Sequence, residues 1–279
     1  MPWPRRNQFY KTYDIKYVKH WIEQAPEFEL KPITVDSADA RKFRAVVNKQ
    51  TNKVVAIVSD KFQLVQHKTV FNLFLDTLED MGYSDVKGMV RWTDTRAYLY
   101  TYFHESDLGM KDKHQFGLVI TNGVDGSLAI WSRIISVRIA CMNLFSGTEL
   151  YKIIKTVHMG IDIETFIDRI QTRFIKVIKA VMDYPDYLTQ QYQQLKQIEI
   201  EYPKAIEFVT KKLDFLPKKA LAVIRWQLRR EDKVTLYDLL QAVTYYLSNY
   251  SEVSDPGKRL VQTVKVEKAI QDLMVQQSL

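Results

Sequence analysis

Five alternating positions from Arg96 to His104 could bind nucleic acid. If this segment is a β-strand, Arg96, Tyr98, Tyr100, Tyr102 and His104 project from one face and the residues between them from the other. Flat rings flanked by potential cations would suit a single strand, because bases stack on aromatic rings and phosphates attract positive charge. The same pattern is typical of a tyrosine-rich sheet face that packs beneath a helix. The sequence leaves both interpretations open.

Five more cations are candidate phosphate contacts. Arg133 and Arg138 lie in an apolar strand pattern, where a guanidinium either pairs with a carboxylate, extends to the surface, or faces a ligand. Arg169, Arg173 and Lys176 recur at helical spacing and form a basic ridge opposite the apolar side of their helix. Such a ridge is usually only a solvated face, but it could also follow a phosphate backbone.

These residues must be positioned by a sheet whose centre is the stretch 117–145, the longest run dense in β-branched and aromatic residues. Residues 117–121 predict one strand, residues 122–126 a tight turn, and residues 127–139 the return strand. Both faces of the return strand are mostly apolar, so we expect it to be internal and covered on both sides.

The spacing of apolar residues along the chain predicts further hairpins and helices. Residues 86–92 and 96–104 predict a second hairpin, and residues 43–48 and 53–58 a third. From Asp162 onward the period changes from two to 3.6. The predicted helices are residues 15–24, 67–81, 163–182, 187–197, 203–213, 217–230, 236–248 and 258–276, the seventh of them capped by Thr235. We therefore predict an α+β fold, with an antiparallel sheet in residues 1–160 and a helical part packed on it in residues 161–279.

Composition narrows the class of protein. No apolar run approaches the roughly 18 to 20 residues that span a bilayer, and the first residues lack the apolar core of a signal peptide, so we expect a cytoplasmic protein with no membrane partner. The net charge of +7 and the pI near 9.2 favour a polyanionic partner. Abundant aromatic residues favour single-stranded DNA in particular. A homo-oligomer is also compatible with the sequence.

Motifs of catalysis are missing from the sequence. It has no P-loop, dinucleotide glycine fingerprint, His-x-x-x-His pair or nucleophile elbow. The single Cys141 excludes an internal disulfide and a multi-cysteine zinc site. Acidic residues are scattered rather than clustered as a two-metal nuclease needs. We therefore expect no enzyme activity, no cofactor and no metal.

Two runs nevertheless resemble a known family. The segments ITNGVDGS and VRIACMN are similar to the signature of the phage- and plasmid-borne family of domain of unknown function 932, an Asn, then Asp-Gly, then Arg-x-x-Cys-x-Asn. Met142 departs from the polar residue expected there, and Gln241 replaces the usual Asn of a C-terminal motif. The matching positions are Asn122, Asp125, Gly126, Arg138, Cys141 and Asn143, with weaker matches at Val58–Asp60, Val65–Gln66 and Ala242–Thr244. The resemblance implies a protein of a mobile genetic element.

Together these features predict a nucleic-acid-binding protein of a virus, plasmid or prophage, acting in replication or in single-strand annealing during recombination. The layout of strands and helices is similar to that of ring-forming annealing proteins. One alternative is a protein-interaction or anti-defence factor that docks a host protein on its tyrosine face, since Tyr is favoured at interfaces. A second alternative is a nuclease with an unrecognised site.

Overall fold

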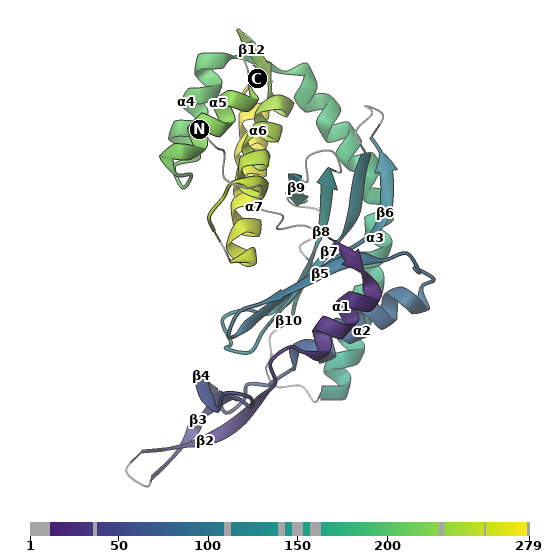
Figure 1. Ribbon diagram of the computed structural model, residues 1–279, viewed down its shortest axis with the longest axis vertical. Helices are drawn as coiled ribbons and strands as arrows, with labels where there is room; N and C mark the ends of the chain where they lie inside the picture. The colour runs from purple at the N-terminus through teal and green to yellow at the C-terminus, as the bar shows by residue number, and fades with distance from the viewer. Residues whose placement is uncertain are drawn as a thin grey trace.

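An antiparallel sheet in the N-terminal part of the chain is followed by a group of helices (Figure 1), which confirms the predicted α+β class. The arrangement is that of a computed structural model. It describes residues 12–35, 38–108, 113–138, 143–146, 153–156, 163–228, 232–253 and 255–277.

The larger sheet has seven strands in the spatial order β1-β5-β6-β7-β8-β10, and the short β9 also pairs with β8. Its strands are β1 (Tyr13–Asp14), β5 (Lys87–Trp92), β6 (Arg96–Asp107), β7 (Lys113–Gly123), β8 (Ile130–Arg138), β9 (Asn143–Ser146) and β10 (Ile153–Thr156). Both predicted hairpins of this sheet are therefore confirmed. The long central strands β6, β7 and β8 bring Tyr100, Val119 and Arg133 into register across the sheet.

Two glycines make this pairing feasible. A Cβ on Gly117 would lie 1.7 Å from the carbonyl oxygen of Thr101, next to a register shift between Tyr102 and His104, so only glycine allows the strands to approach there. Gly126 has a φ of +73° in the turn between β7 and β8, a conformation that glycine adopts without strain.

A smaller three-stranded sheet extends from one end of the molecule (Figure 1). Its strands are β2 (Phe28–Val35), β3 (Ala38–Asn48) and β4 (Lys53–Ser59). The predicted hairpin of residues 43–48 and 53–58 is its β3–β4 pair. Strand β2 was not predicted because Pro32 cannot donate to a ladder; it is tolerated on this edge strand, at a register shift after Pro32.

The helices begin and end close to the predicted positions, with one exception. They are α1 (Ile15–Glu23), α2 (His67–Asp80), α3 (Ile163–Gln197), α4 (Tyr202–Lys212), α5 (Lys218–Gln227), α6 (Leu236–Asn249) and α7 (Pro256–Gln277). Thr235 caps α6 as predicted: its hydroxyl accepts from the Asp238 backbone N–H at 3.1 Å, and the Asp238 carboxylate accepts from the Thr235 N–H at 3.2 Å. The strands β11 (Glu199–Glu201) and β12 (Lys233–Thr235) pair beside it.

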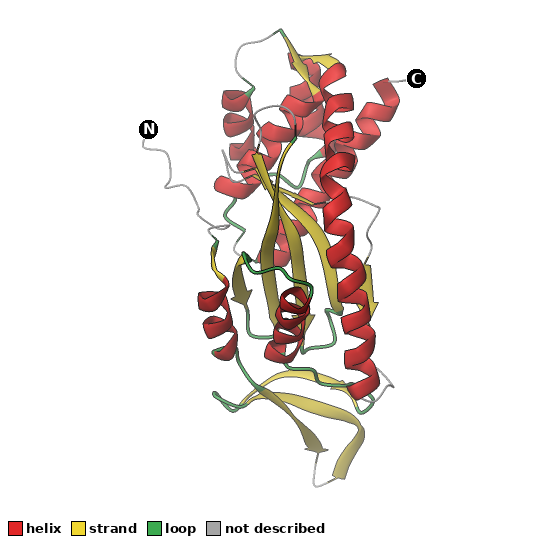
Figure 2. Ribbon diagram, turned by 90° about the vertical axis from the view of Figure 1, so that its right-hand side faces the viewer, coloured by secondary structure: helices red, strands yellow, loops and turns green. Residues whose placement is uncertain are grey.

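The exception is α3, where the two helices predicted over residues 163–182 and 187–197 form one continuous helix through Pro185. A proline inside a helix costs about 3 kcal/mol because it removes one backbone hydrogen bond and its ring clashes with the carbonyl four residues before it. Burial of Tyr184, Leu188 and Tyr192 on either side holds the helix against the core and offsets that cost. As a result, α3 covers the sheet with its first half and reaches the C-terminal helices with its second (Figure 2).

Two apolar clusters cover the two faces of the larger sheet. One face packs against α2 and α3 through side chains that include Leu99, Leu118, Phe74 and Phe174. The opposite face carries a second cluster that reaches Leu260 of α7. The prediction that β8 is internal and covered on both sides is therefore confirmed.

Candidate functional site

The three tyrosines of β6 lie in the second of these clusters, not at the surface. Tyr98, Tyr100 and Tyr102 expose 2%, 0% and 3% of their area. They share this cluster with apolar side chains of β5, β7, β8 and α7, namely Met89, Val119, Ile135, Val137 and Leu260. The interpretation of this face as a solvent-facing stacking platform is wrong, because no base can reach rings that are packed in a core. The alternative, a tyrosine-rich sheet face beneath a helix, is the arrangement found.

The start of α7 contacts Tyr98 closely. Burial raises the pKa of the Tyr98 phenol above its ordinary value, and the negative charge of Asp255 raises it further, while Arg96 opposes the shift. Gly257 packs against the phenol ring. The hydroxyl end of Tyr98 is therefore enclosed where α7 begins.

Arg96 contacts and stabilises the turn between β7 and β8. Its Nε lies 3.8 Å from Asp125 Oδ2, and its Nη2 donates to Ser127 Oγ at 2.8 Å. The Thr95 hydroxyl donates to the same Asp125 oxygen at 2.8 Å. Burial alone would raise the pKa of the Asp125 carboxyl, but the hydrogen bonds from Ser127 and Thr95 and the charge of Arg96 outweigh it, so that the pKa is lowered. Arg96 and the Asp of the family-like motif therefore form an intramolecular pair.

Arg133 is half-buried between the sheet and two helices. Burial lowers the pKa of its guanidinium, while the charges of Glu267 on α7 and Tyr184 on α3 act in the opposite direction. Arg133 therefore faces a carboxylate of its own chain, one of the outcomes expected from the sequence.

Arg138 belongs to a polar cluster that joins β8 and β9 to α6. Its Nη1 donates to Gln241 Oε1 at 3.4 Å. The Asn143 amide donates to the same oxygen at 3.1 Å, and the Asn249 amide lies 3.5 Å from Asn143 Oδ1. Gln241 stands where the family usually has Asn. Its side-chain oxygen thus accepts from the Arg and from the Asn of the Arg-x-x-Cys-x-Asn block. Cys141 and Met142 of that block lie outside the described residues.

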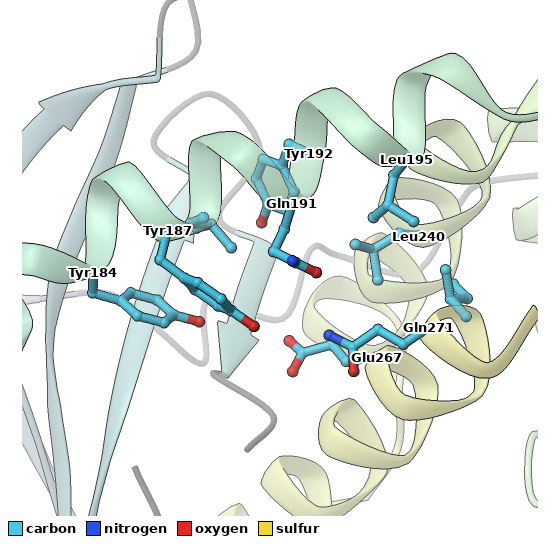
Figure 3. A pocket seen from close by; sticks show the side chains of 10 residues that line it. Tyr184, Tyr187, Gln191, Tyr192, Leu195, Leu240, Glu267 and Gln271 are labelled. Atoms are coloured by element: carbon cyan, nitrogen blue, oxygen red, sulfur yellow. The ribbon is translucent and has the colours of Figure 1, made fainter. Parts of the chain in front are cut away.

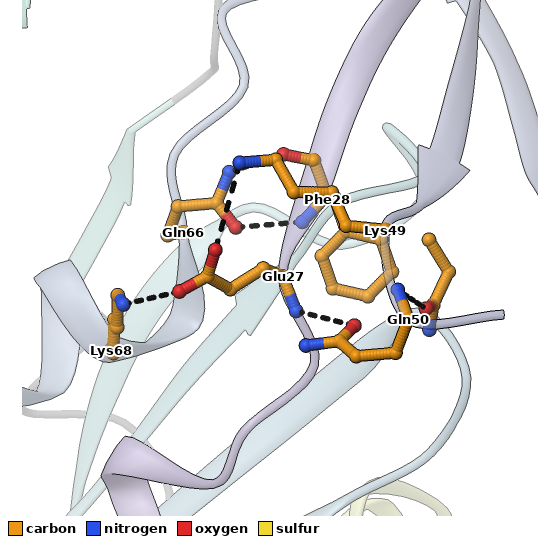
Figure 4. Close-up of polar contacts among 7 residues, drawn as sticks. Glu27, Phe28, Lys49, Gln50, Gln66 and Lys68 are labelled. Carbon is orange, nitrogen blue, oxygen red and sulfur yellow. Dashed lines mark hydrogen bonds and ion pairs between the residues drawn. The ribbon is translucent and has the colours of Figure 1, made fainter. Parts of the chain in front are cut away.

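Asn122 and the weaker family matches Val65 and Gln66 link β7, the start of α2 and strand β2 of the smaller sheet. The Asn122 amide donates to the Val65 carbonyl at 2.9 Å and lies 3.0 Å from His67 Nδ1. The Gln66 side chain accepts from the Phe28 backbone N–H at 3.0 Å and donates to the Phe28 carbonyl at 2.8 Å (Figure 4). These motif residues therefore stabilise the fold.

An ion-pair group beside this contact was not recognised from the sequence. Glu27 pairs with Lys68 of α2 and with Lys49 of the β3–β4 turn (Figure 4). The hydrogen bond and charge of Lys68 lower the pKa of the Glu27 carboxyl. No periodic pattern could indicate this group, because its members come from three separate elements.

The basic ridge of α3, defined by Arg169, Arg173 and Lys176, is at the surface as predicted. Arg169 and Lys176 are exposed and Arg173 is half-exposed. The opposite side of the helix is fixed to the core by Phe166, Ile170, Phe174, Val177 and Ile178. Lys179 is exposed further along the helix. Among the candidate contacts predicted from the sequence, Arg169 and Lys176 are exposed on this helix, with the half-exposed Arg173 between them.

A second exposed cationic surface, on α5, was not recognised from the sequence. Lys218, Lys219 and Arg225 are exposed there, around Trp226. The segment was predicted to be helical, and the signal that could have revealed the surface is an indole between cations at helical spacing.

One cavity lies where α3, α6 and α7 meet. The hydroxyls of Tyr184 and Tyr187 point toward the Glu267 carboxylate across it, with Gln191 and Gln271 alongside (Figure 3). Its volume is about 30 Å³. That is enough for ordered water and far below the several hundred Å³ of a substrate pocket.

Within the part of the chain that the structure describes, no group of three or more His, Cys, Asp or Glu side chains could hold a metal ion. No helix in that part is long and apolar enough to cross a membrane.

The family described as "Domain of unknown function (DUF932)" matches residues 54–272. No curated protein and no solved structure shows a significant match.

Proposed function

We propose that this chain, which belongs to the family of domain of unknown function 932, binds nucleic acid through the basic ridge of α3. The description of the family assigns no activity. The observation that carries the proposal is the placement of Arg169, Arg173 and Lys176 on the solvent side of a helix whose other side is packed on the sheet. Single-stranded DNA is the favoured partner.

The spacing of the ridge suits a phosphate backbone. At 1.5 Å of rise per residue, Arg169 and Lys176 are separated by about 10 Å along the helix, with Arg173 between them. The helix backbone holds the three cations at a fixed spacing, and each phosphate contact releases counterions into solution. The net charge of +7 favours encounter with a polyanion.

This binding mode is electrostatic and does not depend on sequence. The buried tyrosines of β6 supply no stacking, so preference for single strands must come from another surface. A protein of this kind would coat single strands during replication or recombination of a virus, plasmid or prophage, the setting that the sequence resemblance implies.

Fluorescence anisotropy with labelled oligo-dT and duplex DNA across a salt series tests the proposal. We expect log affinity to fall linearly with log salt, by about 0.7 per phosphate contacted on a single strand. Neutralising the ridge (Arg169→Gln, Arg173→Gln, Lys176→Gln) should reduce that slope by about 2.

The matched control removes three exposed lysines from other elements, Lys16, Lys61 and Lys87. It changes the net charge equally and should alter the slope less. Absence of binding at low salt, or equal effects of the two triple variants, would contradict the proposal.

Protein docking is the second candidate, favoured by exposed apolar side chains on the smaller sheet. Phe43, Val54 and Ile57 expose 52%, 62% and 64% of their area. Phe43 and Ile57 are diagonal neighbours on β3 and β4, since Ile57 pairs with Ala45, and β4 is an edge strand. A second copy of the chain could cover this surface.

Light scattering over a range of concentrations tests this second candidate. Self-association that Phe43→Ser with Ile57→Ser abolishes would support it. A mass that stays monomeric at all concentrations would exclude this form of docking.

A further inference from the structure

Helix α5 presents an indole ring among cations. Trp226 exposes 38% of its area, and Lys218, Lys219 and Arg225 are exposed on the same helix. The inner side of α5 is fixed by Ala220, Val223 and Ile224, all buried. The outer side is therefore a fixed surface.

Helical spacing places these side chains on one face. Lys219 precedes Trp226 by seven residues, and Lys218 precedes Arg225 by seven, so each cation lies two turns from its partner on the same side of the helix. Ala222, also exposed, lies one turn before Trp226 and has too small a side chain to cover the ring. The indole is left accessible beside the row of Lys218 and Arg225, and Lys219, on the indole's own row, pairs with Glu252.

The indole ring of Trp226 also packs against Tyr245 of α6. Its centroid lies 6.3 Å from that of Tyr245, with an angle of 38° between the rings, and Tyr245 lies 5.6 Å from Tyr250. Tyr245 is buried on α6. Aromatic contacts of this kind restrain the orientation of the indole while part of it meets solvent. A restrained, accessible ring costs little conformational entropy when another flat group stacks on it.

We infer that Trp226 is a stacking site for an unpaired base of a single-stranded nucleic acid, with Arg225 and Lys218 contacting the adjoining phosphates. The inference rests on the proposed function and adds the surface that would distinguish single strands from duplexes. A paired base inside a duplex is stacked on its neighbours, whereas a base in a single strand is free to stack on the indole. The exposed Lys218 and Arg225 favour a polyanion over a second copy of this basic chain, whereas Lys219 is paired with Glu252.

The probe that separates stacking from charge is a single strand without bases. Wild-type affinity is measured for oligo-dT and for an abasic oligonucleotide with the same number of phosphates. Stacking on one ring should make oligo-dT bind about 5- to 150-fold more tightly than the abasic strand. Tryptophan fluorescence should be quenched by oligo-dT and not by the abasic strand.

The variants are Trp226→Ala, which should abolish the preference for oligo-dT, and Trp226→Phe, which should keep part of it. Trp92→Ala is the matched control, because Trp92 exposes 36% of its area but lies at the end of β5, next to a turn that carries Asp94. The control should keep the full preference. Melting temperatures of all three variants should stay near that of the wild type, because both rings are partly exposed.

The outcomes distinguish the inference from the proposed function. Equal wild-type affinity for the two strands would overturn the stacking site and leave the electrostatic binding of α3 standing. A base preference that survives Trp226→Ala would overturn the assignment to Trp226. A Trp226→Ala variant that changes the oligomeric mass instead would show that the ring docks a second copy. No binding of either strand would overturn both proposals together.

Discussion

Gly257 near the start of α7 lies directly against Tyr98 of β6, so close that a Cβ on Gly257 would fall 2.4 Å from the Tyr98 hydroxyl oxygen. This contact joins the C-terminal helix to the tyrosine face of the sheet. It also explains why the face is closed to solvent at this end.

Gly257→Ala should therefore destabilise the protein, although alanine favours a helix over glycine by about 1 kcal/mol. Forcing a methyl group into a packed contact costs about 1–3 kcal/mol, and the buried Tyr98 ring has little room to move. Urea denaturation measures the change. The Tyr98→Phe substitution removes the hydroxyl, so the double variant should recover part of the loss. A stabilised Gly257→Ala protein would show that the contact is not tight.

Tyr100→Ala should lower the free energy of unfolding by about 3–5 kcal/mol, because Tyr100 is a fully buried large side chain. Tyr17→Ala, at an exposed position on α1, is the control and should change stability little. Both are measured by chemical denaturation, with DNA affinity determined at low temperature where the variant is folded. Affinity should be unchanged. Loss of affinity in a fully folded Tyr100→Ala protein would contradict a purely structural role.

Gln241→Leu should cost about 1 kcal/mol, since it removes the side-chain oxygen that accepts from Arg138 and Asn143, while the Asn143 amide keeps its bond to the Gln241 backbone carbonyl at 3.3 Å. Gln194→Leu, on the exposed side of α3, is the matched control and should be nearly neutral. Thermal unfolding of both variants gives the comparison. Equal effects would mean that the polar cluster contributes no stability.

The Asp125 carboxyl should make stability depend on pH. Its pKa is lowered in the folded protein, so the ionised group contributes stability that is fully present above its unfolded pKa of about 3.9 and is lost as pH falls through the lower folded value. Asp125→Asn should thus be less stable than the wild type at pH 6, with the difference shrinking toward pH 3. Denaturation at a series of pH values checks this, with Asp85→Asn, at an exposed position, as control. A difference that does not change with pH would refute the assignment.

Local patterns alone determined most of the elements. Runs rich in β-branched and aromatic residues, joined by turn residues, located the β3–β4, β5–β6 and β7–β8 hairpins. The 3.6 period located the helices, because it depends only on which side of a helix each side chain occupies. The cap at Thr235 is local in the same way, since it joins residues three apart. The solvent-facing ridge of α3 follows from one period in one helix.

Only the tertiary structure decided which faces are covered. Alternation places Tyr98, Tyr100 and Tyr102 on one side of β6. The side chains that bury them come from other strands and from α7, and α7 lies more than a hundred residues further along the chain. Similarly, Arg138 meets Gln241 across 103 positions of sequence. Burial against the core also allows α3 to continue as one helix through Pro185, although proline locally disfavours a helix interior. Whether a polar or aromatic side chain is available to a ligand depends on what packs over it, and that is set by contacts between distant parts of the chain.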